Sequence, residues 1–279
     1  MNSPETNAPS PQNPHAVRDA VRDAYGKVAE TSSSCCAPSC CSPAADSSEL
    51  PDATTISKGL GYSEQDLASV PADANLGLGC GNPHAIASLR PGEDVLDLGS
   101  GPGLDCLLAA KQVGAEGSVI GVDMTPAMLE RARSNAAQVG AENVSFRLGT
   151  IEHLPVADGS VDVILSNCVI NLSPEKEDVF AEAFRVLRPG GRLAIRDIVA
   201  TAPIPAELQA DFEALTGCVA GAAPVDRIEA ILADLGFIDI QVSIDPGSRA
   251  MVDEWMPGRG AGDVVASASI QAVRPETAG

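Results

Sequence analysis

A run of glycines between an apolar strand and an apolar helix constrains this chain more than any other feature. The segment reads Val95-Leu-Asp-Leu-Gly-Ser-Gly-Pro-Gly103 and continues into a helical pattern at 104–112. Because glycine has no Cβ, the backbone N–H groups of such a turn can approach a ligand closely. The segment therefore predicts the first strand, the binding loop and the first helix of a nucleotide-binding sheet.

The residues that follow alternate between strand and helix patterns. Helical periodicity is found at 104–112, 126–139 and 176–187, and Arg188-Pro-Gly-Gly191 is a stop signal after the last of these. This alternation predicts an α/β fold with a doubly wound, mostly parallel sheet and helices on both faces. The expected strands are short β-branched or leucine-rich runs at 95–98, 119–122, 144–148, 161–165 and 193–198.

Two regions flank this core. A helix is expected at 15–30, and the following segment, rich in Ser, Pro and Ala, is expected to be a flexible arm that carries Cys35, Cys36, Cys40 and Cys41. Beyond the core, helices are expected at 206–216 and 225–235 and strands at 238–244 and 264–273, whereas 251–256 is left unassigned. We therefore divide the chain into an N-terminal helix with a cysteine arm at 1–55, a cofactor-binding domain at 56–200 and a C-terminal α+β substrate-binding region at 201–279.

The charge of the chain limits its partners. It has 18 basic and 38 acidic residues and a formal net charge of −20, so it would be repelled by nucleic acid and by an anionic membrane surface. The polar start of the chain has no apolar core of a signal peptide, and no stretch reaches the roughly 20 apolar residues of a membrane span. We therefore expect a cytoplasmic protein, and for its 8 cysteines we favour catalytic or soft-element-binding roles over a disulfide framework.

The glycine loop indicates the class of cofactor. Gly99, Ser100, Gly101 and Gly103 form the candidate binding turn, but Leu104 stands where a dinucleotide motif needs another glycine. A ligand with a single nucleoside is therefore expected. Asp97, just before the loop, is expected to orient it.

Other candidate cofactor residues follow the ends of later strands. Asp123 lies roughly 20 residues beyond the glycines, where a carboxylate can accept hydrogen bonds from ribose hydroxyls. Thr150 and Ile151 could border an adenine, and Tyr62 could pack over a methionine portion or be an ordinary aromatic at a helix start. Together these features predict binding of S-adenosyl-L-methionine, with the neighbouring residues Met124 and Asn167 added to the candidate site.

Three cysteines lie in segments that could meet near this cofactor. Cys80 and Cys218 are in glycine-flanked loops, and Cys168 follows the fourth expected strand, at the edge where ligands of doubly wound sheets gather. Soft elements select thiolate ligands. A single buried cysteine is more often a small hydrophobic residue, and Cys106 on an apolar helix is expected to be one.

Five segments resemble the arsenite S-adenosylmethionine methyltransferases. Asn-Cys-Val-Ile-Asn-Leu at 167–172 and Gly-Cys-Val-Ala-Gly-Ala at 217–222 are the most specific of them, because methyl-donor motifs are shared by many methyltransferases. The resemblance covers most of 62–237. The other segments that carry it are Asn75-Leu-Gly-Leu-Gly-Cys-Gly-Asn-Pro83, Gly121-Val-Asp-Met-Thr-Pro126 and Phe184-Arg-Val-Leu-Arg-Pro-Gly-Gly-Arg192.

The resemblance implies a Rossmann-like class I methyltransferase fold and an activity that methylates arsenic for detoxification. It also implies that As(III), as arsenite or its thiol conjugates, is held by Cys168 and Cys218, with Cys80 taking part in binding or redox turnover. Thioredoxin or a small thiol is the implied reductant. The lone pair of arsenic carries no proton, so no general base is expected.

Two other functions fit parts of the pattern. A methyltransferase that acts on carbon or oxygen of a small-molecule acceptor would use the same cofactor loop and leave the thiols idle. A non-enzymatic protein that sequesters metalloids would use the thiols with a decayed cofactor site, although the intact glycines and Asp123 argue against decay.

Overall fold

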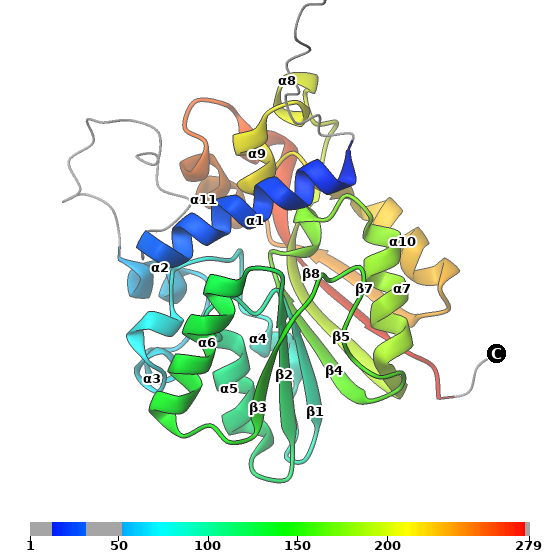
Figure 1. The fold of residues 1–279 in the computed structure, drawn as a ribbon. Coiled ribbons are helices and arrows are strands. Elements are labelled where there is room, and N and C mark those ends of the chain that lie inside the picture. The colour runs from blue at the N-terminus through cyan, green and yellow to red at the C-terminus, as the bar shows by residue number, and fades with distance from the viewer. Residues whose placement is uncertain (1–12, 32–51, 277–279) are drawn as a thin grey trace, which may run out of the picture.

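The computed structural model describes residues 13–31 and 52–276. One eight-stranded sheet with the order β3-β2-β1-β4-β5-β8-β7 forms the centre of the molecule, and β6 pairs with the far end of β5 (Figure 1). The strands β1 to β5 are mutually parallel, whereas β8 runs antiparallel to both β5 and β7. The strands are β1 (Asp94–Leu98), β2 (Ser118–Asp123), β3 (Val144–Leu148), β4 (Val161–Asn167), β5 (Leu187–Ala200), β6 (Ala223–Pro224), β7 (Ile238–Ile244) and β8 (Val265–Val273).

Helices cover both faces of the sheet. Alternate residues of β1 face different apolar clusters: Leu96 packs with α7 and α10, and Val95 packs with α5. Strands buried on both faces read as continuous apolar runs, which explains why the sequence pattern located them. The main helices are α1 (Pro14–Thr31), α5 (Leu104–Val113), α6 (Pro126–Val139), α7 (Lys176–Val186) and α10 (Val225–Asp234).

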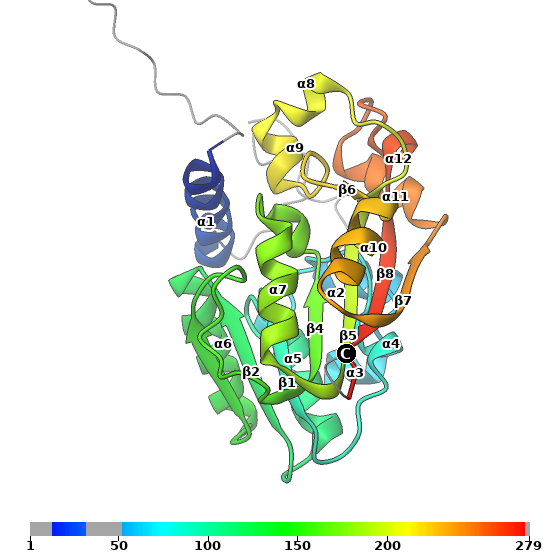
Figure 2. The same ribbon diagram turned by 90° about the vertical axis from the view of Figure 1, so that its right-hand side faces the viewer.

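Short elements surround the ends of the strands. Figure 2 shows α8, α9, α11 and α12 gathered above one end of the sheet, on the same side as α1. These elements bring segments that are distant in the sequence close to the glycine loop at 99–103. The short elements are α2 (Ala53–Gly59), α3 (Glu64–Ala68), η1 (Ala72–Ala74), α4 (His84–Ala87), η2 (Ile170–Leu172), α8 (Ala206–Gln209), α9 (Phe212–Thr216), α11 (Ser248–Trp255) and α12 (Ala261–Val264).

The expected elements are confirmed with two differences. The single helix expected at 206–216 is wrong: the chain forms α8 and α9, because the carboxylate of Asp211 accepts the N–H of Glu213 and starts a new helix. The stop signal at 188–191 does end α7, but its residues already belong to β5. The unassigned segment 251–256 lies mostly in α11. The expected arm with Cys35, Cys36, Cys40 and Cys41 lies outside the described residues.

In the described residues, no helix has both the length and the apolar character needed to cross a bilayer.

Candidate functional site

The glycine loop is held open by backbone hydrogen bonds and one carboxylate. The N–H groups of Gly99 and Ser100 donate to Val122 O at 2.8 and 3.0 Å, and Gly101 N donates to Asp123 Oδ2 at 2.9 Å. Gly101 has a φ of +49°, and a Cβ on it would meet no atom within 4 Å. The loop therefore exposes its backbone to open space, as close approach of a ligand requires.

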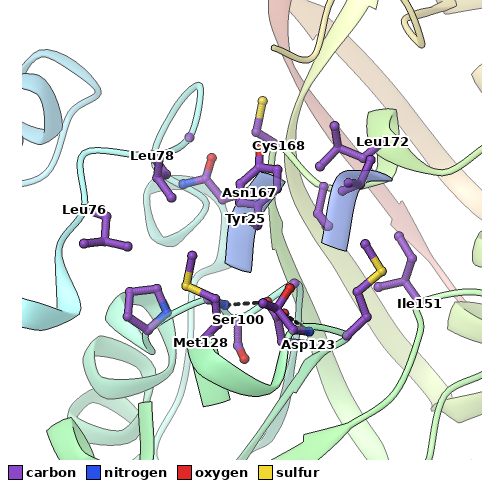
Figure 3. A pocket seen from close by; sticks show the side chains of 18 of the residues that line it. Tyr25, Leu76, Leu78, Ser100, Asp123, Met128, Ile151, Asn167, Cys168 and Leu172 are labelled. Carbon is purple, nitrogen blue, oxygen red and sulfur yellow. Dashed lines mark hydrogen bonds between the residues drawn. The ribbon is translucent and has the colours of Figure 1, made fainter. Parts of the chain in front are cut away.

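A cavity lies between this loop, the ends of β1, β2 and β4, and the covering helices (Figure 3). In that view, Asn167 and Cys168 lie across the cavity from Ser100 and Asp123. Most of the predicted cofactor residues line it, namely Gly99, Ser100, Gly101, Asp123, Met124, Ile151 and Asn167, together with Cys168 and Cys218.

Four predicted residues are not part of this lining: Tyr62, Gly103, Thr150 and Cys80. Tyr62 stands behind the wall, because its hydroxyl donates to Asp105 Oδ1 at 2.7 Å and accepts from Asn167 Nδ2 at 3.0 Å. Stacking of Tyr62 on a bound cofactor is therefore not supported by its position. The hydroxyl instead fixes two side chains that do line the cavity.

The cavity wall is rich in carboxylates. Asp97, Asp105, Asp123 and Glu152 line it, and Arg18 of α1 contributes a guanidinium. Burial raises the pKa of Asp123, and burial followed by the charge of Asp105 raises the pKa of Asp97 well above its ordinary value. A nearby positive charge would offset the cost of ionising these buried carboxyl groups, so the wall favours a ligand that carries positive charge.

Asp97 does not orient the glycine loop, contrary to the prediction. Its carboxylate accepts from the Cys106 thiol at 3.2 Å and, among the described residues, from no N–H group of the loop. Asp123 holds the loop instead, through Gly101 N and through Thr125 N at 2.8 Å. Cys106 is fully buried in α5, as a core residue would be.

The hydroxyl of Ser100 is available to bind a ligand. The hydroxyl of Ser100 is buried on the cavity wall and has no hydrogen-bond partner among the described residues. Buried polar atoms are normally paired. Apolar side chains, including Met128 and Ile151, complete the lower wall, so the cavity suits a ligand with a polar, cationic part and an apolar ring. These features fit S-adenosyl-L-methionine.

The structure brings the three predicted cysteines together. Cys80, Cys168 and Cys218 belong to one buried cluster, and the Cys168 thiol lies close enough to both of the others to interact with them. These interactions and burial raise the pKa of Cys168 well above its ordinary value, and burial raises the pKa of Cys80. The thiols of Cys80 and Cys168 are therefore held in the neutral form. In the described residues no three Cys, His, Asp or Glu side chains already surround a point suited to a metal ion, so the thiols form a chain with Cys168 in the middle.

The backbone is strained at two of these cysteines. Cys168 and Cys218 have φ values of +60° and +62°, in the left-handed region that residues with a Cβ rarely occupy. Cys168 N donates to Arg196 O at 2.8 Å, and the Cys218 thiol donates to Cys168 O at 3.4 Å. Strain of this kind is retained where the surrounding structure imposes it and clusters at functional sites.

Several residues of the site were missed at the level of sequence. Arg18 and Tyr25 of α1, Asp105, Glu152 and Trp255 all line the cavity. Arg18 forms ion pairs with Glu152 at 3.3 Å and with Glu175, which ties α1 across the opening. The helical pattern at 15–30 did not indicate which segments this helix packs against.

A buried acid beside the cluster gives the protein a pH-dependent stability. Asp197 is 3% exposed and accepts from Ile198 N at 2.8 Å and Asn171 N at 3.1 Å, and burial raises its pKa from 3.8 to about 6. The folded state therefore binds this proton more tightly than the unfolded state, so stability falls as the pH rises from about 4 to about 6. The ionised group costs about 3 kcal/mol above that window.

Replacement of Asp197 by asparagine should remove this dependence. The free energy of unfolding can be measured by urea unfolding at pH values from 4 to 7. Relative to the unsubstituted protein, that of Asp197→Asn should rise by about 3 kcal/mol between the lowest and the highest pH. A difference that stays constant with pH would contradict the assignment.

Comparisons with known proteins bear on this arrangement. Residues 89–236 match the model of a methyltransferase domain family. The arsenite methyltransferase of Halobacterium salinarum is 50% identical over 266 residues, which are 95% of this chain and 68% of the relative. The chain belongs to the arsenite methyltransferase family. The arsenite methyltransferase of Aquipseudomonas alcaligenes is 41% identical, over 80% of this chain and 62% of that protein.

A solved structure agrees with the family. An arsenic(III) S-adenosylmethionine methyltransferase from Chlamydomonas reinhardtii is 33% identical and superposes with a TM-score of 0.60, over 82% of this chain and 76% of that one. The expected class I methyltransferase fold is thus confirmed. The chain spans 68% of the length of the Halobacterium salinarum relative and 62% of the length of the Aquipseudomonas alcaligenes relative.

Proposed function

We propose that this chain methylates trivalent arsenic that is bound to Cys168 and Cys218, with S-adenosyl-L-methionine as the methyl donor. The observation that carries the proposal is that both cysteines line the same cavity as the glycine loop and Asp123. A thiol-bound arsenic and a bound donor would then share one enclosed space. The membership in the arsenite methyltransferase family supports the same activity.

Neutral thiols suit the capture of arsenite. Arsenite near neutral pH is As(OH)₃, and each As–O bond is replaced by an As–S bond while the thiol proton leaves with the hydroxide as water. No charge has to be buried in this exchange. The raised pKa values of Cys80 and Cys168 are therefore compatible with binding, and thiols are the ligands that soft elements select.

The donor supplies a methyl group on a sulfonium. In the transfer, the arsenic lone pair forms the As–C bond, and the electrons of the broken C–S bond stay on the sulfur of S-adenosylhomocysteine. The residues of the chain contribute alignment, which can be worth about 7–11 kcal/mol in well-oriented systems. The carboxylates of the wall favour the cationic donor over its neutral product.

Arsenic becomes pentavalent in this step and must gain two electrons before a further methylation. We propose that two thiols supply them by forming a disulfide, which thioredoxin or a small thiol then reduces. Cys35, Cys36, Cys40 and Cys41, outside the described residues, are candidates for this relay together with Cys80.

Arsenic speciation tests the activity. Incubation with arsenite, a thiol reductant and labelled S-adenosyl-L-methionine should yield labelled methylated arsenic. Labelled donor without any methylated arsenical, under reducing conditions, would overturn the proposal. Methyl transfer to a carbon or oxygen acceptor by a Cys168→Ser, Cys218→Ser double variant would favour the rival methyltransferase function.

A further inference from the structure

Both backbone polar groups of Cys80 form hydrogen bonds with side chains. Its N–H donates to Asn167 Oδ1 at 3.1 Å, and its carbonyl accepts from the hydroxyl of Ser267 at 2.7 Å. Cys80 lies in an irregular segment between η1 and α4. The two side chains that hold it come from the end of β4 and from β8. Ser267 of β8 is 187 residues away from Cys80 along the chain. Ser267 is 1% exposed.

The Asn167 amide is fully occupied by this task. Its Nδ2 donates to Gly81 O at 2.9 Å and to the Tyr62 hydroxyl at 3.0 Å, and Tyr62 in turn donates to Asp105. The segment also fits closely on the amide, since a Cβ on Gly79 would lie 2.7 Å from Asn167 Oδ1. Both of the N–H donors of the amide are thus spent on the protein, and the amide acts as a fixed anchor.

These anchors determine where the Cys80 thiol lies. Cys80 does not line the cofactor cavity, but its thiol contacts that of Cys168, which does. A small displacement of the Cys80 segment would separate the two sulfurs. The three thiols form a chain and do not yet surround one point, so Cys80 and Cys218 must move toward a common atom when it binds. Anchors that keep the Cys80 thiol beside Cys168 reduce the freedom lost in that step and should favour ligands that need all three thiols.

We propose that Ser267 and Asn167 are positioning residues that hold Cys80 as the third thiol for inorganic arsenite and so set the preference for arsenite over its methylated product. The proposal rests on the proposed function. As(OH)₃ has three As–O bonds to exchange for As–S bonds, with three molecules of water released. Methylarsenous acid, CH₃As(OH)₂, has only two, which Cys168 and Cys218 can satisfy without Cys80.

The single tryptophan provides the readout. Trp255 is the only one in the chain and lines the cavity with Cys218. Its fluorescence can therefore follow titrations of the full chain with arsenite and with methylarsenous acid, in a buffer with a phosphine rather than a thiol reductant. The quantity of interest is the ratio of the two dissociation constants.

Ser267→Ala should weaken the binding of arsenite roughly tenfold, the effect of one buried hydrogen bond, and leave that of methylarsenous acid unchanged. Ser269→Ala is the matched control, because Ser269 lies two residues further along β8 and makes only a long hydrogen bond of 3.5 Å to Ser243 O. It should leave the ratio unchanged. X-ray absorption at the arsenic edge should count three sulfur neighbours in the unsubstituted protein and fewer in Ser267→Ala.

Tyr62→Phe is a second variant, because it removes the hydroxyl that supports the Asn167 amide while Tyr62 itself does not line the cavity; the hydroxyl bond to Asp105 is lost as well, which is why the readout is the ratio for the two arsenicals. It should shift the ratio in the same direction, and it decides the question if Ser267→Ala does not fold by circular dichroism. Equal weakening of both ligands, an unchanged ratio, or the same shift in Ser269→Ala would overturn the proposal. Failure of the unsubstituted protein to bind either arsenical would instead overturn the proposed function.

Discussion

Serine in place of Cys168 should lower the rate of arsenic methylation at least about 100-fold, because a misplaced reactant alone can cost that much. The substitution removes the sulfur that lies between the other two thiols and lines the cofactor cavity. A hydroxyl oxygen is a hard ligand and a poor substitute for arsenic. Transfer of labelled methyl groups to arsenite, followed by chromatography of the arsenicals, measures the effect.

The affinity of Cys168→Ser for S-adenosyl-L-methionine should remain close to that of the unsubstituted protein, because the loss concerns the acceptor. Serine is nearly the size of cysteine and keeps a Cβ at the same positive φ, so the strained backbone is unchanged. Cys106→Ser is the control for loss of a buried thiol, since Cys106 lies outside the cluster. Near-normal arsenic methylation by Cys168→Ser would refute the role of the cluster.

The parts of the fold that depend on local pattern could be predicted from the sequence. The central strands β1 and β4 were located because they are buried on both faces and read as apolar runs bounded by turns, and the less buried β3 at the edge of the sheet because its short run still contains β-branched and leucine residues. The glycine loop followed from its spacing, and Asp123 from its distance to that loop. Residues 206–216 were misjudged because a side chain of Asp211 competes with the helix backbone, which helical periodicity does not reveal.

The remaining features of the site depend on contacts between distant segments. No pattern within 75–83 indicates that Asn167 and Ser267 hold the Cys80 peptide unit. For Tyr62 the sequence left open packing over the cofactor or an ordinary place at a helix start, and only the structure shows that its hydroxyl has two partners behind the wall. The cysteines were found because soft-element chemistry restricts the residue type, and their meeting point required the strands to be assembled.

The second large effect is expected at the cofactor end of the cavity. Asp123→Asn should raise the dissociation constant of S-adenosyl-L-methionine at least about 100-fold, since hydrogen bonds to a charged group are worth roughly 1.5–3 kcal/mol each. The carboxylate holds Gly101 N and Thr125 N, one on each oxygen. An asparagine side chain has one carbonyl oxygen and an NH₂ group that cannot accept, so one of the two backbone N–H groups loses its partner and the glycine loop loosens. The carboxylate expected to receive the ribose hydroxyls is lost as well.

Calorimetric titration with S-adenosyl-L-methionine distinguishes this loss from a general effect of charge. Asp73→Asn removes the same charge from η1, next to two residues of the cavity wall, but its side chain is 78% exposed. Its dissociation constant should therefore stay within about twofold of the unsubstituted value, because exposed charges are screened by solvent. Arsenite binding followed by Trp255 should survive in Asp123→Asn, since Cys168 lies across the cavity from Asp123. A donor affinity of Asp123→Asn equal to that of Asp73→Asn would contradict the role of the Asp123 carboxylate in cofactor binding.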